Sequence, residues 1–288
     1  MPTIDGLLLV DKPAGCTSHD VVAIARRALG RSRVGHGGTL DPFATGLLVL
    51  LVGRATRLLP YLEGEPKVYA ATIRLGAETD TDDGTGATVR TAPLPDRAAV
   101  ERAMRGLTGD VAQTPPAYSA KQVAGQRAHA AARRGAPLAL APATVTVHDW
   151  ATQAWRDDEV DVTVTCSGGT YVRALARDVG RAAGSAAHLT ALRRLRSGPF
   201  DVAGAATLDA VRAGTAAMLP PLAAVPSLTV VTLDADSVRH VRQGRDVPAG
   251  ESAPGADRAA LVDQTGALVA IAQRNGDWWH PRTVLADD

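Results

Sequence analysis

GHGGTLDPFATG, at residues 35–46, places a single carboxylate, Asp41, on a turn that contains four glycines. Glycine permits positive φ angles and a close approach of the backbone to a ligand, and Pro42 restricts Asp41 to extended geometry. The apolar run LLVLLV of residues 47–52 follows and ends at Gly53, which predicts a buried strand. A carboxylate held on a rigid turn beside a buried strand is typical of a catalytic group, although an Asp-Pro turn that merely caps the strand has the same sequence.

Composition indicates an ordinary globular protein. The 288 residues are 45% hydrophobic and 21% charged, and this length favours two domains. The two cysteines, Cys16 and Cys166, form no C-x-x-C pair, which argues against a zinc site or a disulfide scaffold and fits a reducing cytosol. The N-terminus lacks a signal-peptide pattern, and no segment reaches about 18 consecutive apolar residues, so we expect a cytoplasmic protein that does not span a membrane.

Positive charge is concentrated in three segments, although the formal net charge of the chain is +1. The three basic segments are residues 20–40, 121–134 and 170–198. The balancing acids gather at 78–83 and 157–161. If the basic segments meet in space, one face is positive, as a polyanion ligand requires; three separate solvated faces would have the same composition. In the third segment, Arg173, Arg177 and Arg181 follow one edge of a predicted helix, which is either phosphate-facing or solvated.

Hydrophobic periodicity predicts an α+β fold. The predicted strands are residues 6–13, 47–52, 68–75, 144–150 and 160–166. The predicted helices are residues 18–29, capped by Ser18, and residues 96–107, 126–134 and 168–183. Residues 110–142 differ from the rest, because a proline-stiffened segment leads into a short basic helix. We expect this part to be an exposed, functional insertion.

The C-terminal part has a different pattern. Pro220, Pro221 and Pro226 mark a linker, and short strand-like pieces separated by turn signals follow it. We therefore expect a catalytic domain at residues 1–225 and a small all-β module at residues 226–288, joined by a proline-rich linker that proteases should cut if it is exposed.

Six motifs, in order, resemble the bacterial tRNA pseudouridine synthases of the TruB type, which isomerise the uridine in the T-arm loop of tRNA. They are LLVDKPAG with Thr17 and Ser18 at 8–18, GHGGTLDPFATGL at 35–47, KVY at 67–69, PPAYSA at 115–120 with Gly125 and Arg127, GTYVR at 169–173, and LRR at 192–194. The resemblance covers nearly the whole chain. It implies a mixed, largely antiparallel sheet with flanking helices, an RNA-binding insertion at about 110–142, and a C-terminal PUA-like RNA-binding module.

The resemblance also implies roles for individual residues. Asp41 is the implied nucleophile, Arg173 its ionic partner, and Tyr69 the aromatic residue that stacks on the target base. The implied substrate-binding residues are His36, Tyr69, Tyr171, Leu192, Lys12 and Arg127. For Tyr69, Tyr171 and Leu192 the structural alternative is a place in the core, and for His36 and Lys12 it is support of a turn.

Two residues depart from the family pattern. Gly37 stands where threonine or alanine is usual, and His129 stands where tyrosine is usual. The first change loosens the catalytic turn, and the second removes an aromatic contact of the insertion without touching the chemistry.

The reaction explains the residue types independently. Pseudouridine formation breaks the N1–C1′ bond, turns the base and rejoins it through C5 without gain or loss of atoms, so we expect no metal, redox cofactor or nucleotide. It needs one ionised carboxylate in a dry site, and arginine is a suitable partner because it does not deprotonate. The base must be flipped out, which calls for an aromatic platform such as Tyr69 and a residue such as His36 that fills the vacated space. Attack at C1′, attack at C6 and removal of a 2′ proton are all open to Asp41.

Two other classes of function fit parts of the sequence. One is an RNA-binding or tRNA-folding protein in which catalysis is secondary. The other is a nucleosidase-like glycosidic hydrolase, which normally needs a second, suitably spaced carboxylate and does not need arginine-rich segments. A separate guide RNA is a further variant, but the self-contained insertion favours a monomer that acts on tRNA without an obligate protein partner.

Overall fold

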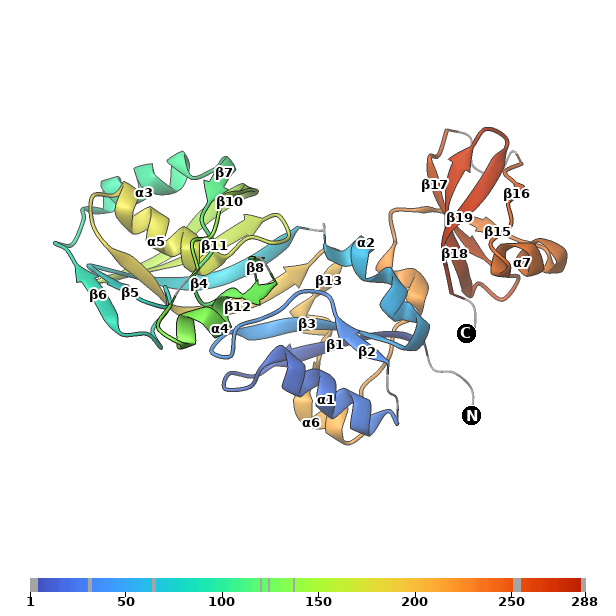
Figure 1. Cartoon of the computed structure of the whole chain (residues 1–288), viewed down its shortest axis with the longest axis horizontal. Coiled ribbons are helices and arrows are strands. Elements are labelled where there is room, and N and C mark those ends of the chain that lie inside the picture. Colours follow the sequence, from blue (N-terminus) through green and yellow to red (C-terminus); the bar gives the residue numbers. More distant parts are fainter. Residues whose placement is uncertain are drawn as a thin grey trace.

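A ten-stranded mixed sheet forms the larger part of the molecule in the computed structural model, which describes residues 5–30, 33–63, 66–119, 121–123, 125–136, 138–250 and 255–285 (Figure 1). Its strands are β1 (Gly6–Lys12), β2 (Val34–His36), β3 (Thr45–Val52), β4 (Lys67–Leu75), β7 (Gly109–Gln113), β10 (Ala143–Arg156), β11 (Glu159–Cys166), β12 (Ala187–Ser197), β13 (Phe200–Asp201) and β14 (Ala206–Thr207). The order is β14-β1-β3-β12-β4-β11-β10-β7, with β2 beside β3 and β13 beside β12. β14 is parallel to β1 and β12 is parallel to β3, whereas the other pairs are antiparallel. The predicted fold class is confirmed.

Helices cover one face of this sheet. They are α1 (Ser18–Ala28), α3 (Arg97–Gly106), α5 (Val172–Ala182) and α6 (Leu208–Arg212), and all four contribute to one apolar cluster with β1, β3 and β4. Figure 1 shows α3 beside α5 and α1 beside α6. Shorter elements are η1 (Gly53–Leu58), α2 (Leu59–Glu63), the hairpins β5 (Ala77–Thr79)–β6 (Thr88–Thr91) and β8 (Gln122–Val123)–β9 (Gln126–Arg127), α4 (Ala128–Arg133), η2 (Val202–Gly204) and η3 (Pro221–Ala224). Among the described residues, no helix is long and apolar enough to cross a membrane.

The first helix begins differently from the prediction. Thr17, not Ser18, is the N-cap: its side chain accepts a hydrogen bond from the backbone of Asp20, whose carboxylate accepts one in return from the Thr17 amide. This reciprocal capping box satisfies two amide groups at the helix start. Ser18 is therefore buried and free to bond elsewhere.

The C-terminal module contains a second sheet. Its strands are β15 (Thr229–Thr232), β16 (Val247–Pro248), β17 (Arg258–Val262), β18 (Leu268–Asn275) and β19 (Trp278–Val284), in the order β15-β17-β18-β19-β16. The predicted β module is present, and it also contains a helix, α7 (Ala235–Arg242), that the strand pattern did not predict. This helix has few apolar residues because it buries only a narrow stripe, Val238 and Val241.

The linker to this module is partly packed: Pro220, Pro226 and Ser227 are exposed, but other parts of it are held by the catalytic part of the chain. Leu7 and Leu219 exchange two backbone hydrogen bonds of 2.9 and 2.8 Å, and Ala224 and Val225 are buried. The reason is that β1 and β3 are apolar on both faces. The face opposite the helices belongs to an apolar cluster shared with the module, which we call the shared cluster. Its main members are Leu7, Leu9, Leu47, Val49 and Leu51 from the sheet and Ala260, Val262, Leu268, Ile271 and Leu285 from the module.

Ile271→Ala tests whether the two parts are one cooperative unit. Truncation of a buried isoleucine costs about 2–5 kcal/mol, and here the cavity opens in the shared cluster. We expect the urea midpoint of the whole chain to fall in a single transition. Val230→Ala, at a half-exposed site of the same module, is the control and should change stability by less than about 0.5 kcal/mol. A catalytic part that unfolds at the wild-type midpoint in Ile271→Ala would contradict this.

Candidate active site

The turn between β2 and β3 carries Asp41, and buried side chains fix its backbone on both sides of the carboxylate. The Ser18 hydroxyl accepts from the Leu40 amide at 2.9 Å and donates to the Leu40 carbonyl at 3.1 Å. The Arg194 guanidinium donates to the Gly38 carbonyl at 3.0 Å. Gly38 has a φ of 111°, a conformation that favours glycine. The turn is thus held by groups from α1 and β12 rather than by its own sequence alone.

Lys12 supports the same turn from β1. Its ammonium group donates to the carbonyls of Pro13 at 2.9 Å, Cys16 at 2.8 Å and Pro42 at 3.4 Å. The residue is fully buried. The prediction that Lys12 binds substrate is therefore wrong for this structure, because its ammonium group is buried and directed at backbone carbonyls. Lys12 supports the turn instead.

Asp41 and Arg173 form the predicted ion pair. Arg173 Nε donates to Asp41 Oδ2 and Nη2 to Oδ1, each at 2.9 Å. The Arg173 side chain is 4% exposed, whereas that of Asp41 is 31% exposed, so the carboxylate opens towards solvent and the guanidinium lies behind it. This bidentate geometry fixes the orientation of both carboxylate oxygens.

Three further groups surround the Arg173 guanidinium. It donates to the carbonyls of Thr81 at 2.8 Å and Tyr118 at 2.9 Å, and Asp83 Oδ2 lies 3.5 Å from Nη1. Sequence reasoning missed both Thr81 and Asp83 as site residues. Both residues lie in the acidic run at 78–83. The charge pattern of that run predicts an acidic face apart from the site, so it did not indicate a contact with Arg173.

Burial raises the pKa of the Asp41 carboxyl above its ordinary value. The charge and hydrogen bonds of Arg173 oppose this shift, and the nearby Asp83 carboxylate adds to it. Asp41 therefore accepts a proton at a higher pH than an exposed aspartate does.

The arginines of the row on α5 are paired with acids, so the prediction that this row is a phosphate-facing edge does not hold. Arg177 pairs with Asp82 and Asp178, each at 2.9 Å, and Arg181 pairs with Glu78 at 2.6 Å. The physical reason is that the row faces the β5–β6 hairpin, whose acids neutralise it. Arg193, on β12, likewise pairs with Asp11 at 2.7 Å.

Two candidate base contacts lie near the turn. Tyr69, on β4, is 6% exposed within the main apolar cluster, and burial raises its pKa. His36 ends β2, is half-buried, and stacks edge-to-face with His19 at a centroid distance of 5.6 Å. Burial lowers the pKa of His36, which favours the neutral imidazole. Its Nδ1 atom is buried and has no hydrogen-bond partner among the described residues.

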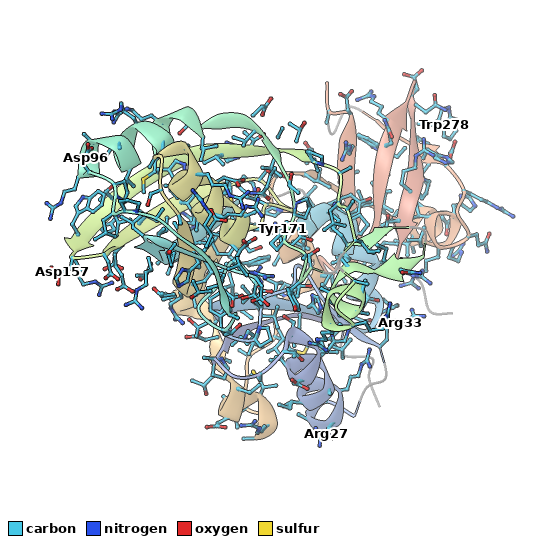
Figure 2. The ribbon with its side chains drawn as sticks, turned by 60° about the vertical axis from the view of Figure 1, so that its left-hand side comes forward. Arg27, Arg33, Asp96, Asp157, Tyr171 and Trp278 are labelled. Carbon is cyan, nitrogen blue, oxygen red and sulfur yellow. The ribbon has the colours of Figure 1, made fainter. Side chains whose placement is uncertain are left out.

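The start of α5 is tied to the insertion. Tyr171 caps the helix near the middle of the molecule (Figure 2), and its backbone exchanges two hydrogen bonds, 2.9 and 3.1 Å, with the side chain of Gln113. Gln113 is buried at the end of β7, near the start of the insertion, and its role gave no sequence signal. Burial raises the pKa of Tyr171. Leu192 is 7% exposed and belongs to the same apolar cluster as Tyr69, and its contact with substrate stays a prediction.

The insertion presents positive charge to solvent. Lys121, Arg133 and Arg134 are exposed on or beside α4. The backbone of Arg127 pairs with Gln122 in the β8–β9 hairpin, and its side chain lies outside what the structure describes. His129 takes the place of the family's tyrosine and bonds the Ser119 carbonyl through Nδ1 at 3.2 Å.

Comparison with known proteins identifies the family. Residues 26–172 match the N-terminal domain of the TruB family pseudouridylate synthases, and residues 173–219 match the tRNA pseudouridylate synthase B C-terminal domain. The chain belongs to the TruB family. Isomerisation of uridine is the reaction of this family, so the chain is an enzyme, a pseudouridine synthase.

Relatives of this TruB chain extend over its whole length. The tRNA pseudouridine synthase B of Thermobifida fusca is 46% identical and covers 98% of this chain and 99% of that protein. That of Cutibacterium acnes is 47% identical, with 92% of each chain covered. Among solved structures, a chain of an H/ACA RNP bound to a substrate RNA containing 2′-deoxyuridine has a TM-score of 0.71 at 25% identity, covering 98% of this chain and 85% of that one. A chain of a Cbf5-Nop10-Gar1 complex gives the same TM-score and coverage at 26% identity.

The raised pKa of Asp41 predicts the acid limb of the pH–rate profile. A reactive carboxylate must be ionised, so the rate at saturating RNA should fall as the pH drops through a pKa above the ordinary aspartate value. Arg173→Lys cannot make the bidentate contact, which leaves burial less opposed and should move this limb to higher pH. We also expect a plateau rate lower by about 100-fold, equivalent to about 2.7 kcal/mol. Arg181→Lys, on the same helix, is the control and should leave the acid limb of the pH–rate profile unchanged. An acid limb at the same pH in Arg173→Lys and wild type would show that this limb does not report Asp41 paired with Arg173.

Proposed function

We propose that this enzyme converts a uridine in the T-arm loop of tRNA to pseudouridine, with Asp41 as the nucleophile, and that it works in the cytoplasm as a monomer without a protein partner. The observation that carries the proposal is the bidentate Asp41–Arg173 pair, with the carboxylate open to solvent and the guanidinium buried behind it. The names of the bacterial relatives, tRNA pseudouridine synthase B, support tRNA as the substrate.

The chemistry requires a single ionised carboxylate at a fixed position. Cleavage of N1–C1′ leaves the bonding electrons on the uracil, which turns and bonds C1′ through C5. The proton lost from C5 is balanced by the proton gained at N1, so no other reactant is consumed. Arg173 keeps Asp41 charged in its partly buried position, and Ser18 and Lys12 prevent the turn from moving when the base rotates.

Tyr69 and His36 receive the flipped nucleotide in this proposal. Tyr69 offers an aromatic surface in the apolar cluster beside the turn, and stacking on such a surface offsets the loss of stacking within the RNA. His36, at the end of β2 beside the turn, fills the space that the flipped base vacates.

A hydrolytic function has less support. The second carboxylate near Asp41 is Asp83, which is buried; its Oδ1 accepts hydrogen bonds from the Thr81 hydroxyl at 2.8 Å and from the Thr85 amide at 3.0 Å. Such an oxygen is held as an acceptor and is poorly placed to donate a proton to a leaving group.

RNA binding is assigned to the insertion and to the C-terminal module. The exposed cations of the insertion are suited to backbone phosphates. We propose that residues 226–288 form a PUA-like RNA-binding module next to a catalytic domain of residues 1–225. Trp278, half-exposed on β19 at the outer side of this module (Figure 2), offers a surface for a nucleotide base.

Asp41→Asn is the direct test of the nucleophile. The amide keeps the shape of the carboxylate but cannot attack, so we expect tRNA to bind and no pseudouridine to form at the T-arm loop in a position-resolved assay. Asp236→Asn, a change on the exposed side of α7, should leave activity unchanged. Turnover by Asp41→Asn would exclude Asp41 as the nucleophile, and uracil release from free uridine by wild type would favour a hydrolase.

Salt dependence tests the insertion. Arg133→Gln with Arg134→Gln should weaken tRNA binding and reduce the log–log salt slope by roughly 0.7–0.9 for each phosphate that the variant no longer neutralises. The rate on bound tRNA should change little, because these residues position the RNA. Arg102→Gln with Arg105→Gln, two exposed arginines on α3, is the matched control. An unchanged slope in the insertion variant would show that α4 does not contact the RNA backbone.

A further inference from the structure

Arg194 is a buried cation without an acidic partner. It is 1% exposed in the middle of β12, and no carboxylate among the described residues lies within ion-pair distance of it. Burying an unpaired charge is unfavourable, so its hydrogen bonds must offset a large desolvation penalty. A feature of this kind, which opposes stability, is expected where it serves the function.

The contacts of Arg194 join the catalytic turn to two strands. Its Nε donates to the Leu47 carbonyl at 2.7 Å and its Nη2 to the Gly38 carbonyl at 3.0 Å. In the sheet, Arg194 is paired with Gly46 of β3 on one side and with Tyr69 of β4 on the other. One residue therefore touches the turn before Asp41, the strand after it, and the strand of Tyr69.

The surrounding glycines show how closely this residue is packed. A Cβ atom at Gly46 would lie 2.3 Å from the Arg194 carbonyl oxygen, and one at Gly38 would lie 3.4 Å from Arg194 Nη1. Both glycines have positive φ, 99° and 111°. The turn and β12 therefore fit together in one arrangement, with Arg194 between them.

The charge of Arg194 affects the pKa of both candidate base contacts, Tyr69 and His36. Burial raises the pKa of Tyr69, and the charge of Arg194, with a hydrogen bond, opposes that shift. Burial also lowers the pKa of His36, and the charges of His19 and Arg194 add to this effect.

Arg194 adds positive charge to the surroundings of Asp41. Unlike Arg173, which pairs with Asp41 and Asp83, it has no carboxylate within ion-pair distance among the described residues. Cleavage of N1–C1′ leaves negative charge on the detached uracil. A fixed cation behind the base platform stabilises that charge without reorganisation.

We propose that Arg194 is a positioning residue for the isomerisation, which holds the catalytic turn and the strand of Tyr69 in register and leaves an uncompensated positive charge behind the site. This role rests on the proposed function. It differs from the substrate contact that the LRR motif suggested, because the guanidinium is buried and directed at backbone carbonyls.

The test compares Arg194→Met, Arg194→Lys and the control Arg196→Met, whose arginine is exposed on the same strand. Three quantities are measured: the single-turnover rate on saturating tRNA, the tRNA affinity, and the pKa of His36 by NMR, assigned with His36→Gln. For Arg194→Met we expect a rate lower by about 100-fold, an affinity within about threefold of wild type, and a higher His36 pKa, because a cation is lost. Arg194→Lys should restore the His36 pKa but only part of the rate, since lysine cannot reach both carbonyls. The control should match wild type.

A wild-type rate in Arg194→Met, or a His36 pKa unchanged by it, would overturn the proposal. If Arg194→Met does not fold, Arg194→Lys decides, because a full wild-type rate in that variant would show that the two-carbonyl contact is dispensable. A wild-type protein that makes no pseudouridine in tRNA would remove the proposed function, whereas the His36 titration would still report on Arg194.

Discussion

The rest of the site depends on the ion pair between the Arg173 guanidinium and Asp41. The guanidinium contacts three segments that are far apart in the sequence: the turn of Asp41, the loop at Thr81 and Asp83, and the insertion at Tyr118. Each of the three offers an acceptor, and the planar guanidinium favours acceptors that lie close to its own plane. A displacement of any one segment is therefore felt at the carboxylate.

Many arginines of this protein pair with its own carboxylates. The arginines of α5 and the acids of the β5–β6 hairpin neutralise one another across an internal boundary, and Arg193 is neutralised by Asp11. Asp82, at the centre of that boundary, has a φ of 59°, which few residues other than glycine adopt. The modest net charge thus hides dense internal pairing, whereas the cations Lys121, Arg133 and Arg134 of the insertion stay exposed.

The sequence was informative where a residue type has few alternative uses. The sequence correctly predicted the turn that carries Asp41, the place of Arg173 on α5 and the strand β4. Each of these depends on local geometry or on a sharp motif. β12 was not predicted, since its inward-facing Arg194 interrupts the apolar alternation and its burial depends on carbonyls from β3 and the turn. Ser18 was misassigned as the helix cap for a similar reason, because its partner, Leu40, is distant in the chain.

The pairing of Leu7 with Leu219 bears on how the protein is made. β1 is synthesised before its parallel neighbour β14, which begins at Ala206, and before the residues from Ala260 on that cover its outer face. Until these later segments have been made, β1 and β3 expose an apolar face that would attract chaperones. The turn of Asp41 lies between β2 and β3, and the Arg194 side chain that holds it comes from β12, so the turn is complete only after β12 has paired with β3. A chain that stops before the later segments would lack a stable core, and degradation is its expected fate.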